Sequence, residues 1–134
     1  MQSDVEIIGS CSGKESSTFK CEGMNTFIRW DINLENLDFK IESEFNVDQA
    51  RTPVIFVLWS GNRKFMTQVS SQTNLDLNEF QTIVVKRAGN SLKIDLDGTQ
   101  LKDTNLEASI DAVGWRPLRN TIYIKSLKLD YGNS

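Results

Sequence analysis

The chain has 134 residues, the length of one domain, and its 39% apolar and 25% charged residues are typical of globular rather than disordered proteins. The net charge of −3, from 15 basic and 18 acidic residues, gives no electrostatic reason to expect nucleic acid as a partner. The longest apolar run is Val54–Trp59, far below the length of a membrane span. We therefore expect a single globular domain over residues 1–134, with no nucleic-acid partner and no membrane span.

Two cysteines, Cys11 and Cys21, flank a polar stretch near the N-terminus. A disulfide between them would join the first two strands, as in proteins of an oxidising compartment. The alternative is two free thiols packed as small core residues, and two cysteines alone decide neither pairing nor compartment. No targeting segment follows Met1, so the localisation stays open: extracellular or cell-surface if the chain is an excised domain.

Alternation of apolar and polar residues is the main signal along the chain. In Leu37–Val47 every second residue is apolar or small, and the residues between them are polar or charged. Leu92–Leu96 and Ile122–Tyr131 repeat the pattern, the latter with a phase slip of one residue near Lys125–Ser126. This period is typical of strands with one buried face, and the slip predicts a β-bulge.

Further short segments have strand composition and are separated by turn residues such as Gly61-Asn62, Gly89-Asn90 and Asp97-Gly98. The other expected strands are Val5–Ile8, Phe19–Glu22, Met24–Ile32, Val54–Trp59, Lys64–Gln72, Phe80–Arg87, Thr99–Leu101 and Glu107–Val113. About ten short strands at this spacing indicate an all-β, two-sheet antiparallel β-sandwich. Val54–Trp59 is apolar on both faces, which predicts a central strand whose outer face is also covered.

The chain resembles the concanavalin A-like jelly-roll superfamily, which includes laminin G-like domains, sialidase lectin domains and galectins. The segments that carry the resemblance are Leu37–Val47, Val54–Trp59, Asn78–Arg87, Asn90–Gly98 and Asn120–Leu129. The resemblance implies a jelly-roll sandwich that binds a glycan or a protein. The His-x-Asn-Pro-Arg motif of galectins and the Glu-x-Asp-x-x-Glu motif of glycosidases with this fold are both absent.

No convincing catalytic group is visible, so we do not expect an enzyme. Two carboxylate pairs, Glu42/Glu44 and Asp95/Asp97, have the i, i+2 spacing that places side chains on one strand face. Alternation with core residues is the usual pattern of a solvated sheet face, and we favour that interpretation. The chain has no histidine, which excludes a Ser-His or Cys-His nucleophile.

Two segments combine a tryptophan with polar side chains that could bind a sugar. Trp59 is followed in a turn by Asn62 and Arg63, although it could instead be a core residue that ends an apolar strand. Trp115 follows a glycine and precedes Arg116 and Arg119, a setting that we interpret as an exposed turn. A third tryptophan, Trp30, is in phase with apolar neighbours and is expected in the core.

A polar segment offers oxygen atoms that a hard cation could use. Asn74, Asp76, Asn78 and Glu79 lie close together in sequence, but their spacing does not match a calcium loop. We therefore interpret the segment as a polar turn, expect no required cofactor, and retain Ca²⁺ as a minor alternative. Zinc is not expected, because histidine is absent and only two cysteines are present.

The leading hypothesis is a non-catalytic, lectin-like carbohydrate-binding module whose partner is a glycan or glycoprotein. Aromatic rings would pack on the sugar, and guanidinium groups would donate paired hydrogen bonds to vicinal hydroxyls or to a sugar carboxylate. The first alternative is a laminin G-like adhesion domain that binds a protein. A weaker alternative is an accessory domain related to glycoside hydrolases.

Overall fold

The computed structural model describes residues 4–13, 18–70, 79–125 and 127–132, and this part of the chain is mostly extended strand. It contains eleven antiparallel strands. No helix within the described residues is long and apolar enough to cross a membrane. The strands are β1 (Asp4–Ser12), β2 (Thr18–Glu35), β3 (Phe39–Val47), β4 (Val54–Ser60), β5 (Arg63–Val69), β6 (Gln81–Ala88), β7 (Ser91–Leu96), β8 (Thr99–Asn105), β9 (Ile110–Arg116), β10 (Leu118–Lys125) and β11 (Lys128–Tyr131).

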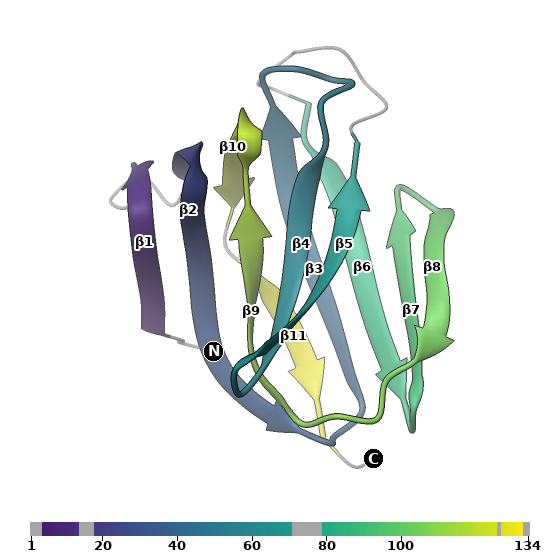
Figure 1. Ribbon diagram of the computed structural model, residues 1–134. Helices are drawn as coiled ribbons and strands as arrows, with labels where there is room; N and C mark the ends of the chain where they lie inside the picture. Colours follow the sequence, from purple (N-terminus) through teal and green to yellow (C-terminus); the bar gives the residue numbers. More distant parts are fainter. Residues whose placement is uncertain (1–3, 14–17, 71–78, 126, 133–134) are drawn as a thin grey trace.

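Strand β2 belongs to both layers of a sandwich, because its first part pairs with β10 and its second part with β9. Sheet A has the order β1-β2-β9-β4-β5. Sheet B continues from β2 through β10, β3, β6 and β7 to β8, with β11 beside β3. Figure 1 shows β4 and β5 in front of β3 and β6. The predicted all-β, two-sheet antiparallel sandwich is confirmed.

The bend in β2 depends on glycine and on one buried threonine. Gly9 and Gly23 have φ of 99° and 104°, a conformation that residues with a Cβ rarely adopt. Oγ1 of Thr26 accepts a hydrogen bond from the amide of Ser10 and donates one to the carbonyl of Glu22, at 3.0 and 2.6 Å. These bonds replace ladder bonds at the bend, so one strand runs where the sequence predicted two.

The core between the sheets follows the predicted alternation. Along β3 the side chains of Phe39, Ile41, Ser43 and Phe45 are buried, whereas those between them are only partly so. Trp30 is buried as predicted.

The predicted phase slip near residue 125 is present as a change of register. Ile124 lies opposite Phe45, and Lys128 lies opposite Glu42. Four residue steps on one side therefore match three on β3, which is the one-residue excess of a bulge. The register change lies between β10, which pairs with both β2 and β3, and β11, which pairs with β3.

The two cysteines form a disulfide bond. Cys11 of β1 and Cys21 of β2 lie directly opposite each other in the antiparallel pair, and the bond joins their sulfur atoms. The first of the two alternatives left open by the sequence is therefore confirmed. The bond ties β1 to the bent part of β2.

Candidate functional site

Strand β4 is buried on both of its faces. Val54, Phe56 and Leu58 point into the main core, whereas Ile55, Val57 and Trp59 belong to a separate apolar cluster on the outer face of sheet A. The outer cluster is completed by Ala112, Phe27 and Leu118. This arrangement confirms the prediction that something covers the outer face of β4, and the cover comes from neighbouring strands.

The register of sheet A aligns the outer side chains of different strands in rows. Each row crosses β2, β9, β4 and β5 or part of them. One row holds Arg116, Ile55 and Gln68, the next Arg29, Gly114, Val57 and Met66, and the third Asp31, Ala112, Trp59 and Lys64. Phe27 of β2 packs on the same face. The middle of the face is occupied by glycine and alanine, so the long side chains around it can lean inwards.

Cations cover the aromatic rings of this face. The guanidinium carbon of Arg29 lies 5.0 Å from the ring centroid of Trp59, and that of Arg116 lies 5.1 Å from the ring centroid of Phe27. Lys64 Nζ is 5.8 Å from the Phe27 centroid, and the two rings pack edge to face at 6.1 Å. These five residues are called the cation–aromatic cluster below. Such contacts favour a cation over a ring face and hold it in a defined place.

Two arginines of the cluster are further fixed by hydrogen bonds. Nε of Arg29 donates to Oδ1 of Asp31 at 2.7 Å. Nε of Arg116 donates to the carbonyl of Met24 at 2.9 Å. With Nε engaged and the guanidinium packed on Phe27, the two terminal nitrogens of Arg116 remain oriented to donate elsewhere.

A cavity of about 550 Å³ lies beside the cluster, at the end of the sandwich where β3 leads into β4. It is lined by Met24, Gln49, Arg51, Thr52, Pro53, Leu118 and Arg119, and is called the Met24 cavity below. Met24 and Leu118 connect it with the cluster, because Met24 accepts the bond from Arg116 and Leu118 packs on the outer apolar residues.

The buried Asn120 side chain holds the walls of the Met24 cavity together. Its Oδ1 accepts a hydrogen bond from the amide of Gln49 at 3.0 Å, and its Nδ2 donates to the carbonyls of Gln49 and Thr52, both at 2.8 Å. The neighbouring Leu118 has φ of 57°, an uncommon conformation for a bulky residue that stores local strain. Strained backbone fixed by a buried amide is typical of loops held in one conformation.

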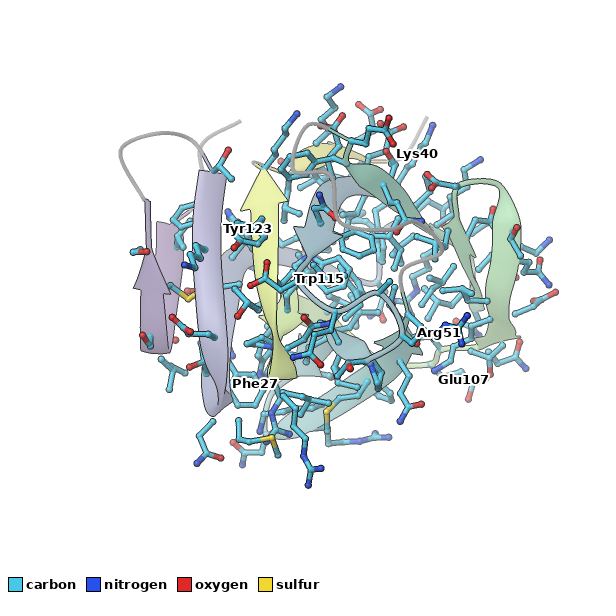
Figure 2. The ribbon with its side chains drawn as sticks, turned by 90° about the horizontal axis from the view of Figure 1, so that it is seen from above. Phe27, Lys40, Arg51, Glu107, Trp115 and Tyr123 are labelled. Carbon is cyan, nitrogen blue, oxygen red and sulfur yellow. A yellow bond between two sulfur atoms is a disulfide. The ribbon has the colours of Figure 1, made fainter. Side chains whose placement is uncertain are left out.

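The prediction that Trp115 lies in an exposed turn is wrong. Its side chain is 0% exposed, and its Nε1 donates a 2.9 Å hydrogen bond to Oγ of Ser43. Its ring centroid lies 4.8 Å from that of Phe45 and 5.2 Å from that of Phe56, and Figure 2 shows Trp115 in the interior. Gly114 misled the prediction, because it serves a close approach between strands and not a turn.

The other predicted site residues fall into two groups. Trp59, which is only 5% exposed, and Arg116 belong to the cation–aromatic cluster, and Arg119 lines the Met24 cavity. Asn62 and Arg63 lie at the turn after β4, at the opposite end of that strand from the cavity. Since β4 spans seven residues, the separation along it is roughly 20 Å. Arg119 thus lines the Met24 cavity and Arg116 is bonded to a residue of its wall, whereas Asn62 and Arg63 lie at the other end of β4.

Sequence reasoning missed Phe27, Arg29, Lys64 and Arg51. Phe27 and Arg29 alternate with the core residues around them, which places both on the outer face of β2. That signal was present in the sequence. The position of Arg51 depends on the fold of the loop before β4, for which the sequence holds no local pattern.

Three of the four carboxylates considered for catalysis, Glu42, Glu44 and Asp97, have structural partners. Glu42 pairs with Lys40 at 3.1 Å and Glu44 with Lys125 at 3.2 Å. Asp97 accepts hydrogen bonds from the amide of Thr82 and from Nε2 of Gln81. These contacts fit the solvated-face interpretation.

The polar segment considered for calcium falls mainly in residues 71–78, outside the described residues. Of its four oxygen donors only Glu79 is described. Within the described ranges, no group of three or more His, Cys, Asp or Glu residues could hold a metal ion.

No protein-family model matches the sequence, and no curated protein sequence matches it. Solved structures do. Carbohydrate-binding module CBM66 from Bacillus subtilis superimposes with a TM-score of 0.72 at 14% identity, over 94% of each chain. The chain has the concanavalin A-like jelly-roll fold. The resemblance inferred from the strand patterns is thereby confirmed at the level of fold.

Carbohydrate-active enzymes share this fold with the chain. A candidate glycosyl hydrolase from Parabacteroides distasonis has a TM-score of 0.65 at 10% identity, covering 85% of this chain and 86% of its own. The alginate lyase AlgAT5 of polysaccharide lyase family 7 has a TM-score of 0.61 at 9% identity, covering 90% and 81%. Binding modules and enzymes are thus both among the similar structures, and identities this low define the fold alone.

Proposed function

We propose that the chain is a non-catalytic carbohydrate-binding module whose ligand occupies the Met24 cavity and extends over the cation–aromatic cluster. The observation that carries the proposal is the composition of the cavity. Met24, Pro53 and Leu118 form the apolar part of the wall. Gln49, Arg51 and Arg119 supply planar hydrogen-bonding groups. Sugar sites combine these two kinds of surface, because a pyranose has apolar faces and a rim of hydroxyls.

Preorganisation supports the same site. Asn120 fixes the loop that bears Gln49 and Thr52, and the hydrogen bond to the Met24 carbonyl fixes Arg116 next to the cavity. A loop that is already ordered loses little conformational entropy when ligand binds, so weak individual contacts can add up to measurable affinity. The similarity in fold to CBM66 is consistent with the proposal without identifying a ligand.

Binding without cleavage is part of the proposal. The described residues that line the Met24 cavity include no aspartate or glutamate, and hydrolysis of a glycosidic bond needs a pair of carboxyl groups. A glycan incubated with the protein should therefore keep its chain length in size-exclusion chromatography.

The proposal is tested by calorimetric titration with a panel of neutral and acidic polysaccharides. We compare wild type with Met24→Trp, which fills the cavity, and with Leu101→Trp, a control on β8 at the edge of sheet B. Met24 is 46% exposed and Leu101 is 37% exposed. We expect saturable binding to at least one polysaccharide, weakened about tenfold or more by Met24→Trp alone. Absence of binding across the panel, or equal binding by the two variants and wild type, would overturn the proposal.

A further inference from the structure

Two arginines from distant parts of the sequence line the Met24 cavity. Arg51 comes from the loop between β3 and β4, and Arg119 from the start of β10. The cavity wall formed by described residues has no carboxylate. Within the described part of the chain, ion pairs join Arg29 to Asp31, Lys40 to Glu42 and Lys125 to Glu44, and none of these pairs involves Arg51 or Arg119.

This composition contrasts with the rest of the molecule. The whole chain carries 18 acidic and 15 basic residues and has a net negative charge. The described lining of the Met24 cavity, with two cations and no acidic residue, has the opposite sign of charge. Another cavity of about 400 Å³, at the opposite end of β3, has Lys40 and Lys86 but also Asp38 and Asp130 in its lining. Cations in that second cavity have carboxylates beside them, whereas the described residues that line the Met24 cavity include none.

The backbone that carries the two arginines is fixed. Asn120, next to Arg119, donates its side-chain hydrogen bonds to the carbonyls of Gln49 and Thr52, on either side of Arg51. The amide of Asn120 also donates to the carbonyl of Pro117 at 3.0 Å, which closes the turn that presents Arg119. One buried side chain therefore sets the spacing between the two cationic segments. Like charges held near each other repel, and an anion bound between them would remove that cost.

We infer that the Met24 cavity binds an acidic glycan, whose carboxylate or sulfate group lies between Arg51 and Arg119. The inference rests on the proposed function and assigns the ligand class to the same site. A guanidinium presents parallel N–H groups that match the oxygens of a carboxylate or sulfate. Two guanidinium groups can therefore donate hydrogen bonds to one such anion from opposite sides. The apolar residues Met24 and Leu118 would contact the sugar ring that carries the acid.

The test compares polygalacturonate with the same polymer after methyl esterification, which removes the charge and keeps the sugar backbone. We expect wild type to bind the acid form about tenfold more tightly or better, and to lose that advantage as NaCl is raised from about 50 to about 500 mM. Dextran sulfate against dextran repeats the comparison for sulfate. Inorganic sulfate, added as a competitor, distinguishes a free anion site from a site that also needs the sugar.

Three variants locate the effect. Arg51→Gln and Arg119→Gln keep a hydrogen-bonding side chain without the charge, and Arg63→Gln is the matched control at the far end of β4. Each cavity variant should weaken acid-polymer binding by about tenfold to a hundredfold, while Arg63→Gln binds as wild type. Circular dichroism confirms that the variants are folded.

The outcomes separate this inference from the proposed function. Equal affinity for charged and esterified polymers, both lowered by Met24→Trp, would overturn the acidic-ligand inference and keep the carbohydrate-binding proposal. Unchanged binding by Arg51→Gln and Arg119→Gln would likewise overturn the inference. Binding of inorganic sulfate alone, with no glycan bound, would overturn both.

Discussion

The indole Nε1 of Trp115 donates a 2.9 Å hydrogen bond to Oγ of Ser43, and the bond crosses the core from β9 of sheet A to β3 of sheet B. Both residues are fully buried. A polar pair inside an apolar core stabilises the fold only when both partners are satisfied, because an unpaired buried donor keeps its full desolvation cost. The pair therefore fixes how the two sheets face each other.

Ser43→Ala should lower the free energy of unfolding by about 1–3 kcal/mol, because it leaves the indole N–H without an acceptor. Urea denaturation followed by tryptophan fluorescence measures the change. Ser109→Ala is the control, since the Ser109 hydroxyl accepts a bond from Asn36 at an exposed position. Equal stability of the two variants would contradict the role given to Ser43.

Gly114→Ala should destabilise the protein by several kcal/mol. A Cβ at Gly114 would lie 1.8 Å from the carbonyl oxygen of Ile28, so β9 and β2 would have to separate. Gly89→Ala is the matched control: its φ is 60° with open space around it, so only the backbone preference is lost, about 1–2 kcal/mol. Thermal melting of the two variants measures the difference. Similar melting temperatures would mean that the strands can separate freely at Gly114.

Alternation in the sequence predicted the strands and their buried faces, because successive side chains of a strand point to opposite faces of the sheet. Whether each residue is apolar or polar therefore indicates which face is buried. It identified the inward face of β3 and the double burial of β4 without any long-range information. It misjudged Gly114, since a glycine in a turn and a glycine at a close strand contact look alike in sequence. What distinguishes them is the carbonyl of Ile28, which lies on another strand.

The candidate site was only partly predictable for the same reason. Arg116 and Arg119 were identified from their local composition, but their neighbours Met24 and Arg51 come from other parts of the chain. Their meeting depends on the bend in β2 and on the hydrogen bonds of Asn120. Such long-range contacts follow from strand pairing, which a single sequence does not encode as a local pattern.

Arg87→Lys should lower the free energy of unfolding by about 2 kcal/mol or more. The Arg87 guanidinium is buried, 2% exposed, and donates to backbone carbonyls of the β8–β9 connection, Leu106 and Ala108, both at 2.7 Å. Burial lowers the pKa of this guanidinium, and the nearby Asp38 charge raises it in part. A lysine carries the charge on one nitrogen and cannot reach both carbonyls with the same geometry.

Urea denaturation of Arg87→Lys is compared with that of Arg63→Lys, in which the same exchange is made at an exposed position. The control should stay within about 0.5 kcal/mol of wild type. If Arg87→Lys is equally mild, the connection between β8 and β9 does not depend on the guanidinium.

Tyr123 should make the stability depend on pH in the alkaline range. Burial raises the pKa of its phenol above the ordinary value of 10.0, and a hydrogen bond to Asp48 with the negative charges of Asp48 and Glu22 raises it further. The unfolded chain then loses this proton at a lower pH than the folded chain. The contribution of Tyr123 to stability is complete below pH 10 and declines as the pH rises from there through the folded pKa.

Absorbance at 295 nm during alkaline titration, compared between wild type and Tyr123→Phe, isolates the Tyr123 phenolate. Its midpoint should lie above 10, and Asp48→Asn should move it downwards, because the variant removes a charge that opposes ionisation. Denaturation at several alkaline pH values should show a flatter decline of stability for Tyr123→Phe than for wild type. A midpoint at or below 10, or no shift in Asp48→Asn, would mean that the phenol and the carboxylate are not in contact in solution.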